Sequence, residues 1–562
     1  MKKASFPLLL VFAAAASAGA LDTSNPTDGV YRQLDLWAGK GYVTRLPLLR
    51  PYPAQLVASL LRDVIDRGDP ESVRRAEEML AEVTRKIAIR PEAYHATRAT
   101  QDDVYSVTGG YAAARGSLTD LIALSTQLGV LAVVEPGAEA AFIPGERFPV
   151  DYYVDWSALS AAGITILPTL SAGGTAAIGT DRFWFQIGLA RHSFGPFDEG
   201  PVLSPQAAQA GHLSFSWRGP RLSYTEFLLT LTATSDRGDA LHDDGDVSVY
   251  PNKYLTGHSF QFSPLSWLDI GLFETVVFGE RIEPVYLVPV VSRTYTSIYA
   301  GSIDNLMLGF SASARLPADV GLDLVFYADD MHFLDMLSLD FDTKYKVAAQ
   351  AGVSWTPLRR LLKRVSLDYA LVTPYTYTHT RESIQGVEEQ NFANGMYLNY
   401  YNYSHYGRSL VALDPNSDRL RLRALLTPRD RLNVTVSATY QRHAKATKDG
   451  YPDPGSTTIG TSDGGINDNG YVDDGDHLFD TVNFLSQDVI EQILLLGAEA
   501  SWQMPLGRGV LFVEVGYTLE VAQNKRSDGP APTLGTWTNG PVPIEGNDVV
   551  LHHVSLGLRY AY

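Results

Sequence analysis

The chain has 562 residues, a formal net charge of −18 and no cysteine. The lack of cysteine excludes disulfides, thiolate metal sites and catalytic thiols, and the acidic balance argues against nucleic acid as a partner. With 30 Tyr, 22 Phe and 8 Trp, the chain is rich in aromatic residues, while only 45% of it is hydrophobic. This profile is typical of transmembrane β-barrels, which combine aromatic girdles with a polar lumen.

Residues 1–20 have the pattern of a signal peptide. Lys2 and Lys3 precede an apolar run that begins at Phe6, and Ala18 and Ala20 form an A-x-A cleavage pattern. The run is shorter than the roughly 20 apolar residues of a membrane-spanning helix. We therefore expect cleavage near Ala20, which removes two lysines and leaves a net charge of −20. No later stretch reaches the roughly 18 continuous apolar residues of a transmembrane helix, so a membrane crossing would require a barrel.

Residues 21–100 are predicted to form a small helical region on the periplasmic or plug side of the molecule. Apolar residues recur at helical spacing from Val30 onward. Asp69 followed by Pro70 predicts the capped start of a third helix, whose apolar stripe continues to Ile87. Three short helices bury little surface alone, so we expect them to pack against a larger body.

Residues 101–562 are predicted to form an outer membrane β-barrel with long extracellular loops. Apolar residues alternate with polar ones in six hairpins that have short turns, several of them with proline. The hairpins cover residues 212–229, 259–279, 307–330, 347–372, 420–441 and 497–520. Long polar connections separate them, and this alternation of short turns with long loops is typical of an up-and-down barrel. Two to six further strands between residues 104 and 190 give an even total of roughly 14 to 20 antiparallel strands.

The last residues are predicted to be the closing strand. Val554, Leu556, Leu558, Tyr560 and Tyr562 alternate with smaller or polar residues, so they would face lipid while their neighbours face the lumen. Pairing of this strand with the first one would leave no free sheet edge. A terminal aromatic residue resembles the signal by which outer membrane proteins contact their insertion machinery, so we expect Tyr562 to serve that contact.

No catalytic motif is present. The chain has no G-x-S-x-G, P-loop or H-E-x-x-H pattern, so we expect a non-enzymatic protein with no cofactor. His192 and Ser193 are adjacent, and side chains of adjacent strand residues point to opposite faces, so they would not form a catalytic pair. Asp468, Asn469 and Asp473 belong to an acidic loop over 463–476. That loop offers oxygen ligands for calcium, but it lacks the EF-hand spacing and is better explained as a solvated loop.

A tyrosine-rich segment is the best candidate for ligand binding. It contains Tyr397, Tyr400, Tyr401, Tyr403, His405, Tyr406 and Arg408. Aromatic faces beside amide and hydroxyl groups suit sugar rings, which predicts a polysaccharide site. The alternative is an interfacial girdle, since tyrosine is enriched there. Tyr400 and Tyr401 are consecutive and would point to both faces, unlike a girdle on one face.

Several segments together resemble the Wzi capsule assembly family. They are "VYRQLDLWAGKGYVTRLPLLRPYP", "FWFQIGLARHSFGPFDEGPVLSP", "SIDNLMLGFSASARLP" with "LVFYADDMHF", and "YLNYYNYSHYGRSLVALDPNSDRL". The resemblance implies a barrel of about 18 strands in the outer membrane, helices near the periplasmic side and non-enzymatic binding of capsular polysaccharide. It also implies a structural or lumen-facing role for Asp304, Asn305, Asp329 and Asp330.

Three arginines leave two functions open. Arg419, Arg421 and Arg423 alternate and would share one strand face. With Arg408 they could form a basic patch for an acidic surface polysaccharide; equally, they could line the lumen of a porin or passive transporter. An outer membrane hydrolase is a third hypothesis. The expected partners are surface polysaccharide and outer membrane lipid, for a protein that is a monomer.

Overall fold

The computed structural model describes most of the chain. The described residues are 23, 25–99, 104–119, 121–134, 159–161, 164–233, 252–279, 281–301, 304–331, 345–359, 361–374, 376–378, 400–405, 408–444, 484–506, 509–526 and 543–561. The predicted signal peptide over residues 1–20, the acidic loop over 463–476 and Tyr562 lie outside these residues.

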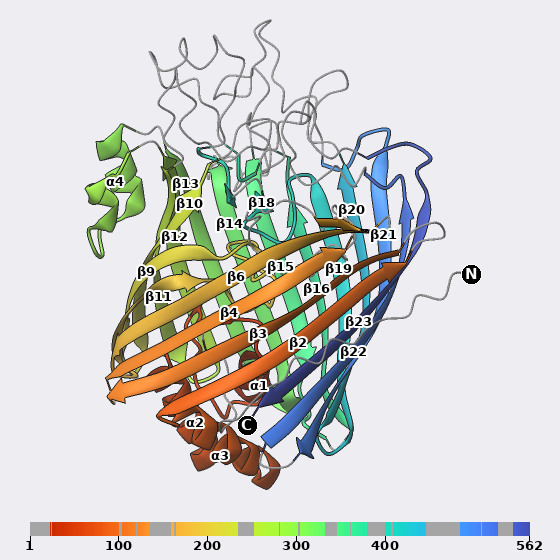
Figure 1. Ribbon diagram of the computed structural model, residues 1–562. Helices are drawn as coiled ribbons and strands as arrows, with labels where there is room; N and C mark the ends of the chain where they lie inside the picture. Colours follow the sequence, from red (N-terminus) through yellow and green to blue (C-terminus); the bar gives the residue numbers. More distant parts are fainter. Residues whose placement is uncertain are drawn as a thin grey trace, which may run out of the picture.

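The main body is a closed antiparallel β-barrel with tilted strands (Figure 1). Its long strands are β2 (Ile87–Ala99), β3 (Val104–Thr119), β4 (Ile122–Val134), β6 (Ile164–Gly179), β7 (Phe183–Ala190), β9 (Ala210–Arg218), β10 (Leu222–Thr232), β11 (Asn252–Leu265), β12 (Leu268–Gly279), β13 (Asn305–Leu316), β14 (Val320–Met331), β15 (Tyr345–Trp355), β16 (Leu362–Val372), β19 (Ser417–Arg429), β20 (Leu432–Ala444), β21 (Ile490–Leu506), β22 (Gly509–Gln523) and β23 (Val549–Ala561). The three-residue β5 (Leu159–Ala161) pairs with β6. Within the described residues, eighteen long strands thus form the wall, which confirms the expected fold class.

Closure depends on the two ends of the sheet. β23 pairs with β22 on one side and with β2 on the other, with Leu556 opposite His95. The predicted pairing of the closing strand with the first strand is therefore confirmed. Because every neighbouring pair in the wall is antiparallel, closure requires an even number of strands, and the barrel has no exposed sheet edge.

All six predicted hairpins are present, as β9–β10, β11–β12, β13–β14, β15–β16, β19–β20 and β21–β22. Their short turns lie at one end of the barrel, here termed the turn end; the opposite end of the strands, where the long connections of the sequence begin, is termed the loop end (Figure 1). In outer membrane barrels, short turns are periplasmic and long loops external.

Strand β19 illustrates the two faces of the wall. Leu420 and Leu422 are 44% and 47% exposed, whereas Arg419 and Arg421 between them are buried. Alternate side chains point to opposite faces of a strand, so the leucines face outward and the arginines face the lumen. The same alternation holds in β23, where Val554, Leu556 and Leu558 are exposed as predicted.

The helical region lies at the turn end (Figure 1). It comprises α1 (Gly29–Gly39), α2 (Ala54–Arg67) and α3 (Pro70–Val83). The Asp69 carboxylate accepts hydrogen bonds from the backbone N–H groups of Glu71 and Ser72, which confirms the predicted helix start. The helices pack on inward-facing wall residues such as Trp184.

The predicted extent of this region was wrong at one point. The third helix ends at Val83, and Ile87 is the first residue of β2 rather than part of a helical stripe. Barrel strand β2 therefore lies inside the range 21–100 that was predicted to be helical. Ile87 stands four residues after Val83, a spacing that suits a helix, and a short apolar pattern of this kind does not distinguish a helix from a strand.

No helix of the described residues is long and apolar enough to span a membrane.

Candidate functional site

The barrel lumen contains chain segments that come from both of its ends. We term the described residues 43–53, 191–209, 400–405 and 408–416 the inner plug. The segment 43–53 follows α1 at the turn end, and the other segments belong to connections at the loop end. Two of them meet as a small sheet, in which β1 (Leu49–Arg50) pairs with β8 (Ser193–Phe194).

An apolar core joins the inner plug to the wall. Phe194 of β8 lies against Phe227 and Phe273 of the wall, with ring centroids 6.0 and 4.9 Å apart. The buried members of this core are Leu48, Leu49, Phe194, Val202, Leu203, Ala207, Ala210, Phe227, Leu229, Leu231, Leu255, Phe273, Val277, Met307, Val325, Tyr327, Ala348, Ala370, Val372, Tyr377, Tyr403, Leu410, Val411 and Leu413. Burial of apolar surface on this scale stabilises the plugged state, at about 25 cal/mol per Å² removed from water.

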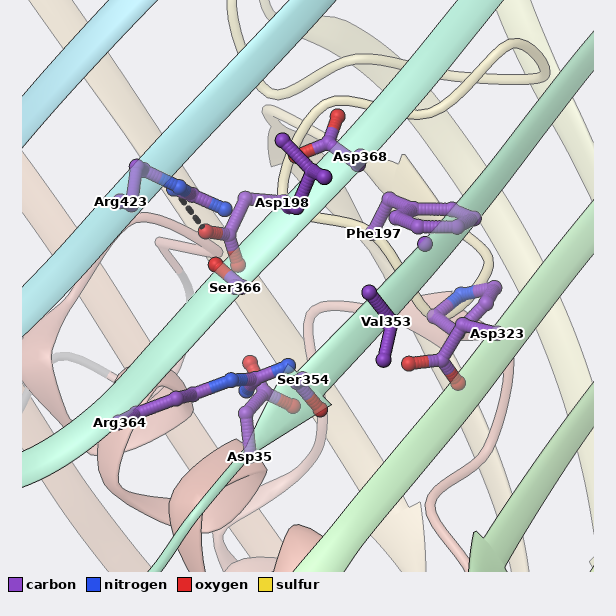
Figure 2. Close-up of a pocket in the computed structure, with 13 residues that line it drawn as sticks. Asp35, Phe197, Asp198, Asp323, Val353, Ser354, Arg364, Ser366, Asp368 and Arg423 are labelled. Atoms are coloured by element: carbon purple, nitrogen blue, oxygen red, sulfur yellow. Dashed lines mark hydrogen bonds and ion pairs between the residues drawn. The ribbon is translucent and has the colours of Figure 1, made fainter.

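The three alternating arginines of β19 contact carboxylates of the inner plug. Arg419 forms an ion pair with Glu199, and Arg421 Nη1 lies 2.8 Å from Glu199 Oε2. Arg423 Nη1 lies 2.6 Å from Asp198 Oδ2, the contact dashed in Figure 2. The arginine face therefore points into the lumen, as in one of the two readings of the sequence, but plug carboxylates neutralise it.

The wall contributes a further carboxylate to this cluster. Arg421 Nε lies 3.2 Å from Asp368 Oδ2 on β16, and Asp368 also accepts a hydrogen bond from Gln350 Nε2 at 2.8 Å. Arg421 thus bridges two strands and the plug. Buried charges are stable only when paired and hydrogen-bonded. Here Glu199 and Asp368 neutralise Arg421, and Arg421 and Gln350 donate hydrogen bonds to Asp368.

The electrostatic environment keeps the plug carboxylates ionised. The positive charge of Arg423 holds the pKa of Asp198 well below its usual range, against the effect of burial. Burial raises the pKa of Glu199, but the charges of Arg421 and Arg419 outweigh it and lower the pKa overall. Opposite charges within a few ångströms favour the charged form.

A polar pocket lies beside this cluster (Figure 2). It is lined by plug residues Phe197 and Asp198, by Asp35 of α1, and by wall residues that include Arg364 and Arg423. Asp35 is also tied to the plug: Arg50 Nη1 donates a hydrogen bond to its Oδ2 at 3.1 Å. Helix α1, the plug and the wall therefore meet around one set of charges.

Arg50 fastens the helical region to the plug. Its guanidinium lies over the rings of Tyr31 and Tyr52, 5.2 and 5.7 Å from their centroids, and pairs with Asp35. Burial raises the pKa of Asp35, while Arg50 acts in the opposite direction. Cation–π contacts of a desolvated arginine are worth about 2 kcal/mol, so Arg50 holds β1 and α1 in a fixed relation.

The described residues of the predicted polysaccharide site are buried within the inner plug. Tyr400 and Tyr401 are each 2% exposed, Tyr403 is 0% exposed and His405 is 3% exposed. Tyr403 Oη lies 2.6 Å from Tyr327 Oη of β14. His405 Nδ1 accepts a hydrogen bond from the Thr232 backbone N–H at 2.9 Å. These four residues anchor a plug segment to the wall. Because they are buried, they form neither an interfacial girdle nor an open sugar-binding surface.

The other predicted site residues are placed as follows. Tyr397 and Tyr406 lie outside the described residues, and Arg408 belongs to the two-residue β18 (Arg408–Ser409), with its side chain outside the description. Arg421 is buried in the cluster described above. The predicted site is therefore brought together only in part: Tyr403 and His405 lie in one plug segment that contacts the wall. Arg421 is a wall residue that pairs with Glu199 and Asp368 instead.

The family-like acidic positions divide in the same way. Asp304 and Asn305 are buried, and Asn305 Nδ2 donates a hydrogen bond to the Tyr401 carbonyl at 2.9 Å. The side chains of Asp329 and Asp330 lie outside the description.

A serine and a histidine on neighbouring strands are hydrogen-bonded, as a hydrolase would require. Ser417 Oγ lies 2.8 Å from His443 Nδ1 across the β19–β20 pair. Both are buried, at 1% and 3% exposure, so a substrate would have no access to Ser417 in this state. His192 instead lies edge-to-face against His212, and burial together with that neighbour holds the pKa of His192 well below its usual range.

Among the described residues, no group of three or more His, Asp or Glu side chains is placed to hold a metal ion.

The residues that the sequence prediction missed are Asp198 and Glu199, which stand in "GPFDEGP". An acidic pair between prolines and glycines is typical of a solvated turn. Its pairing with Arg419, Arg421 and Arg423 is visible only in the folded structure.

Comparisons with known proteins agree with this fold. No protein-family model matches the chain, and no curated protein matches its sequence. The solved structure of Wzi, an outer membrane protein involved in group 1 capsule assembly in Escherichia coli and described as a carbohydrate-binding β-barrel, matches with a TM-score of 0.54 at 12% identity. The match covers 98% of this chain and 100% of that one. The chain has the fold of Wzi.

The resemblance expected from the sequence is thus confirmed at the level of fold, which is that of an outer membrane β-barrel. Two structures from Pseudomonas aeruginosa also match, OccD3 (OpdP) with a TM-score of 0.41 at 11% identity and OprD with a TM-score of 0.41 at 11% identity. Each match covers 85% of this chain; the matches cover 91% of the OccD3 chain and 92% of the OprD chain.

Proposed function

We propose that this protein is a non-enzymatic barrel of the outer membrane that binds or anchors capsular-type surface polysaccharide and does not conduct solutes. The Wzi structure, which has the same fold, is described as carbohydrate-binding and as involved in capsule assembly. Surface polysaccharide and outer membrane lipid are the proposed partners, Tyr562 is the proposed contact for the insertion machinery, and the proposed state is a monomer.

One observation supports this proposal over a porin. The arginines that would line a pore are paired with Asp198 and Glu199 of the inner plug. Removing the plug would leave Arg419 and Arg421, which are about 95% buried, without plug partners. Separating one partner from a buried pair typically costs about 3–5 kcal/mol. The apolar core around Phe194 adds to that cost.

The first experiment measures conductance in a planar bilayer. We expect the wild-type protein to be silent and Arg421→Glu to produce channel openings, because it sets a carboxylate against Glu199 and Asp368. Arg429→Glu is the matched control, since Arg429 is an exposed arginine at the turn end of the same strand. A steady wild-type channel would contradict the proposal and support a passive transporter.

The second experiment measures polysaccharide binding. The probe is surface polysaccharide extracted from the organism's own cells, with dextran as the unrelated control polymer. We expect the purified barrel to retain the former and not the latter. Absence of binding, together with open channels, would reject a polysaccharide-anchoring role.

A set of tyrosine variants locates the binding residues. We expect Tyr397→Ala, Tyr406→Ala and Arg408→Gln to lower polysaccharide binding. Tyr403→Ala should lower stability as well, because its ring is fully buried against Tyr327 and Tyr377, and large-to-small changes of core aromatics cost about 3–5 kcal/mol. Unchanged binding in the first three variants would remove this segment as the polysaccharide site.

A further inference from the structure

The connection between β12 and β13 folds back along the outside of the barrel. Its described residues 281–301, here termed the outer strap, contain η2 (Pro284–Leu287) and α4 (Arg293–Ala300). In Figure 1, α4 lies outside the wall, apart from the inner plug. The strap packs on wall residues Val276 and Phe278 through Tyr286.

Beneath the strap, three ionisable residues form a row across adjacent strands. Glu226 of β10 stands opposite His258 of β11, which stands opposite Glu274 of β12. Their chain neighbours Phe227 and Phe273 belong to the core inside the lumen. Because successive strand residues point to opposite faces, Glu226 and Glu274 point outward, toward the membrane.

Residues at the start of α4 bind the carboxylates of this row. Arg293 Nη2 lies 2.6 Å from Glu226 Oε1, and the Arg293 backbone N–H donates a hydrogen bond to Glu274. Ser292 Oγ donates to Glu274 Oε1 at 3.0 Å, and His258 Nε2 lies 3.1 Å from Glu274 Oε2.

A tyrosine connects the row to the rest of the strap. Tyr224 Oη donates to Glu226 Oε2 at 2.6 Å and accepts from the Val290 backbone N–H at 2.8 Å. Glu226 and His258 are thereby buried, and the carboxylates of Glu226 and Glu274 are both hydrogen-bonded, as ionic groups removed from water require.

The polarity of the strap is inverted relative to that of a helix in water. The side chains that α4 buries are Arg293, Thr296 and Ser297. The charged residues of the strap are all in ion pairs with the protein: Arg281 with Asp304 and Glu283, and Arg293 with Glu226.

The outward side of the strap is instead apolar and aromatic. Its exposed large side chains are Ile282 (71%), Leu287 (39%), Val288 (42%), Val290 (62%), Tyr295 (64%), Ile298 (66%) and Tyr299 (74%). A helix that packs on a soluble protein buries its apolar stripe and exposes its polar face. The reverse arrangement is stable where the surroundings are hydrocarbon.

The position of the strap agrees with a lipid environment. Glu274 lies midway along β12, so the strap reaches well below the loop end. Leu272 on the same strand and Leu308, the partner of Glu274 on β13, are 58% and 45% exposed and belong to the lipid-facing wall. The apolar side of the strap is continuous with that surface.

We propose that the outer strap is a lipid-binding surface that inserts into the outer leaflet and contacts its acyl chains. Val288, Val290 and Ile298 face the chains, and the hydroxyls of Tyr295 and Tyr299 reach the headgroup level, where tyrosine is enriched. The Arg293–Glu226 pair and Glu274 hold the strap against the wall. The site needs only the barrel fold and is independent of polysaccharide binding.

The test uses single cysteines, because the chain has none of its own. The full-length protein, in the variants Val288→Cys and Ile298→Cys, is labelled with bimane and reconstituted in dimyristoylphosphatidylcholine vesicles. Leu272→Cys is the control for a lipid-facing position. Glu78→Cys is the control for water, since the Glu78 side chain on α3 is 50% exposed. Quenching is measured with iodide in the buffer and with 5-doxyl lipid in the bilayer.

We expect both strap positions to be quenched by the doxyl lipid as strongly as position 272, with about fivefold less quenching by iodide than position 78, because the bilayer interior excludes water and ions. Iodide quenching equal to that at position 78 would overturn the proposal. Protection from both quenchers would also overturn it, because a protein surface and not lipid would then cover the strap.

Discussion

Arg421 Nη1 of the barrel wall lies 2.8 Å from Glu199 Oε2 of the inner plug. The two residues are 222 positions apart in the chain, and their contact decides whether the arginine face lines a pore or anchors a plug. Arg419 shares the same carboxylate, so Glu199 neutralises two wall arginines at once.

Glu199→Gln should destabilise the barrel by about 3 kcal/mol, because it leaves two buried arginines without their shared carboxylate. The measurement is urea unfolding in vesicles, followed by the shift of the folded band on an electrophoresis gel. Glu78→Gln on the exposed face of α3 is the control and should change stability by less than about 1 kcal/mol. Equal stability of the two variants would show that the plug contact contributes nothing.

The contribution of Glu199 should also depend on pH. Its folded-state pKa is lowered from 4.5, so the stabilisation is fully present above that value and is lost as the pH falls through the folded-state pKa. We expect the stability difference between wild type and Glu199→Gln to be constant from about pH 8 to pH 6 and to shrink below about pH 4.5. A difference that grows on acidification would contradict the assigned direction of the pKa shift.

Arg293→Met should lower stability by about 3–5 kcal/mol, because Glu226 would remain at the outer wall without a cation. Adding Glu226→Gln should recover part of the loss, since removing both charges of a buried pair is often close to neutral. Thermal unfolding of the two variants measures this, with Arg74→Ala as the control, because that change breaks only exposed ion pairs, with Glu78 and Asp430. A double variant less stable than Arg293→Met would argue against a charge penalty.

Gly309→Val should destabilise the wall by about 1–3 kcal/mol through overpacking. A Cβ at Gly309 would lie 1.9 Å from Cε2 of Phe273, whose ring is held in the lumen core. Gly29→Ala at the start of α1 has open space around it and should stay within about 0.5 kcal/mol of wild type. Thermal unfolding of both variants gives the comparison.

Ser417→Ala should have no effect on hydrolysis of phospholipid or ester substrates, because Ser417 and His443 are buried. It should cost about 1 kcal/mol through loss of their hydrogen bond. An activity of the wild type that disappears in this variant would instead identify a hydrolase.

Local patterns determined a large part of the fold. The period of two in the six hairpins and the alternation of Leu420 and Leu422 with the arginines depend only on strand geometry, so they could be recognised in the sequence. The start of α3 at Asp69 and Pro70 is a local hydrogen-bonding pattern and was equally visible. The parity of turns and loops then implied a barrel, because an up-and-down topology repeats it.

The roles of the charged and aromatic residues were decided only by tertiary structure. An arginine face has the same pattern whether it binds a polysaccharide, lines a pore or meets Glu199, and a tyrosine-rich segment has the same pattern whether it is exposed or packed on Tyr327. The inverted polarity of α4 likewise has meaning only once Glu226 and Glu274 are found beneath it. The sequence by itself determined the strands and their two faces, because these follow from interactions between near neighbours. The plug and the outer strap depend on which distant residues the closed barrel brings within hydrogen-bonding distance, and only the folded chain specifies those pairs.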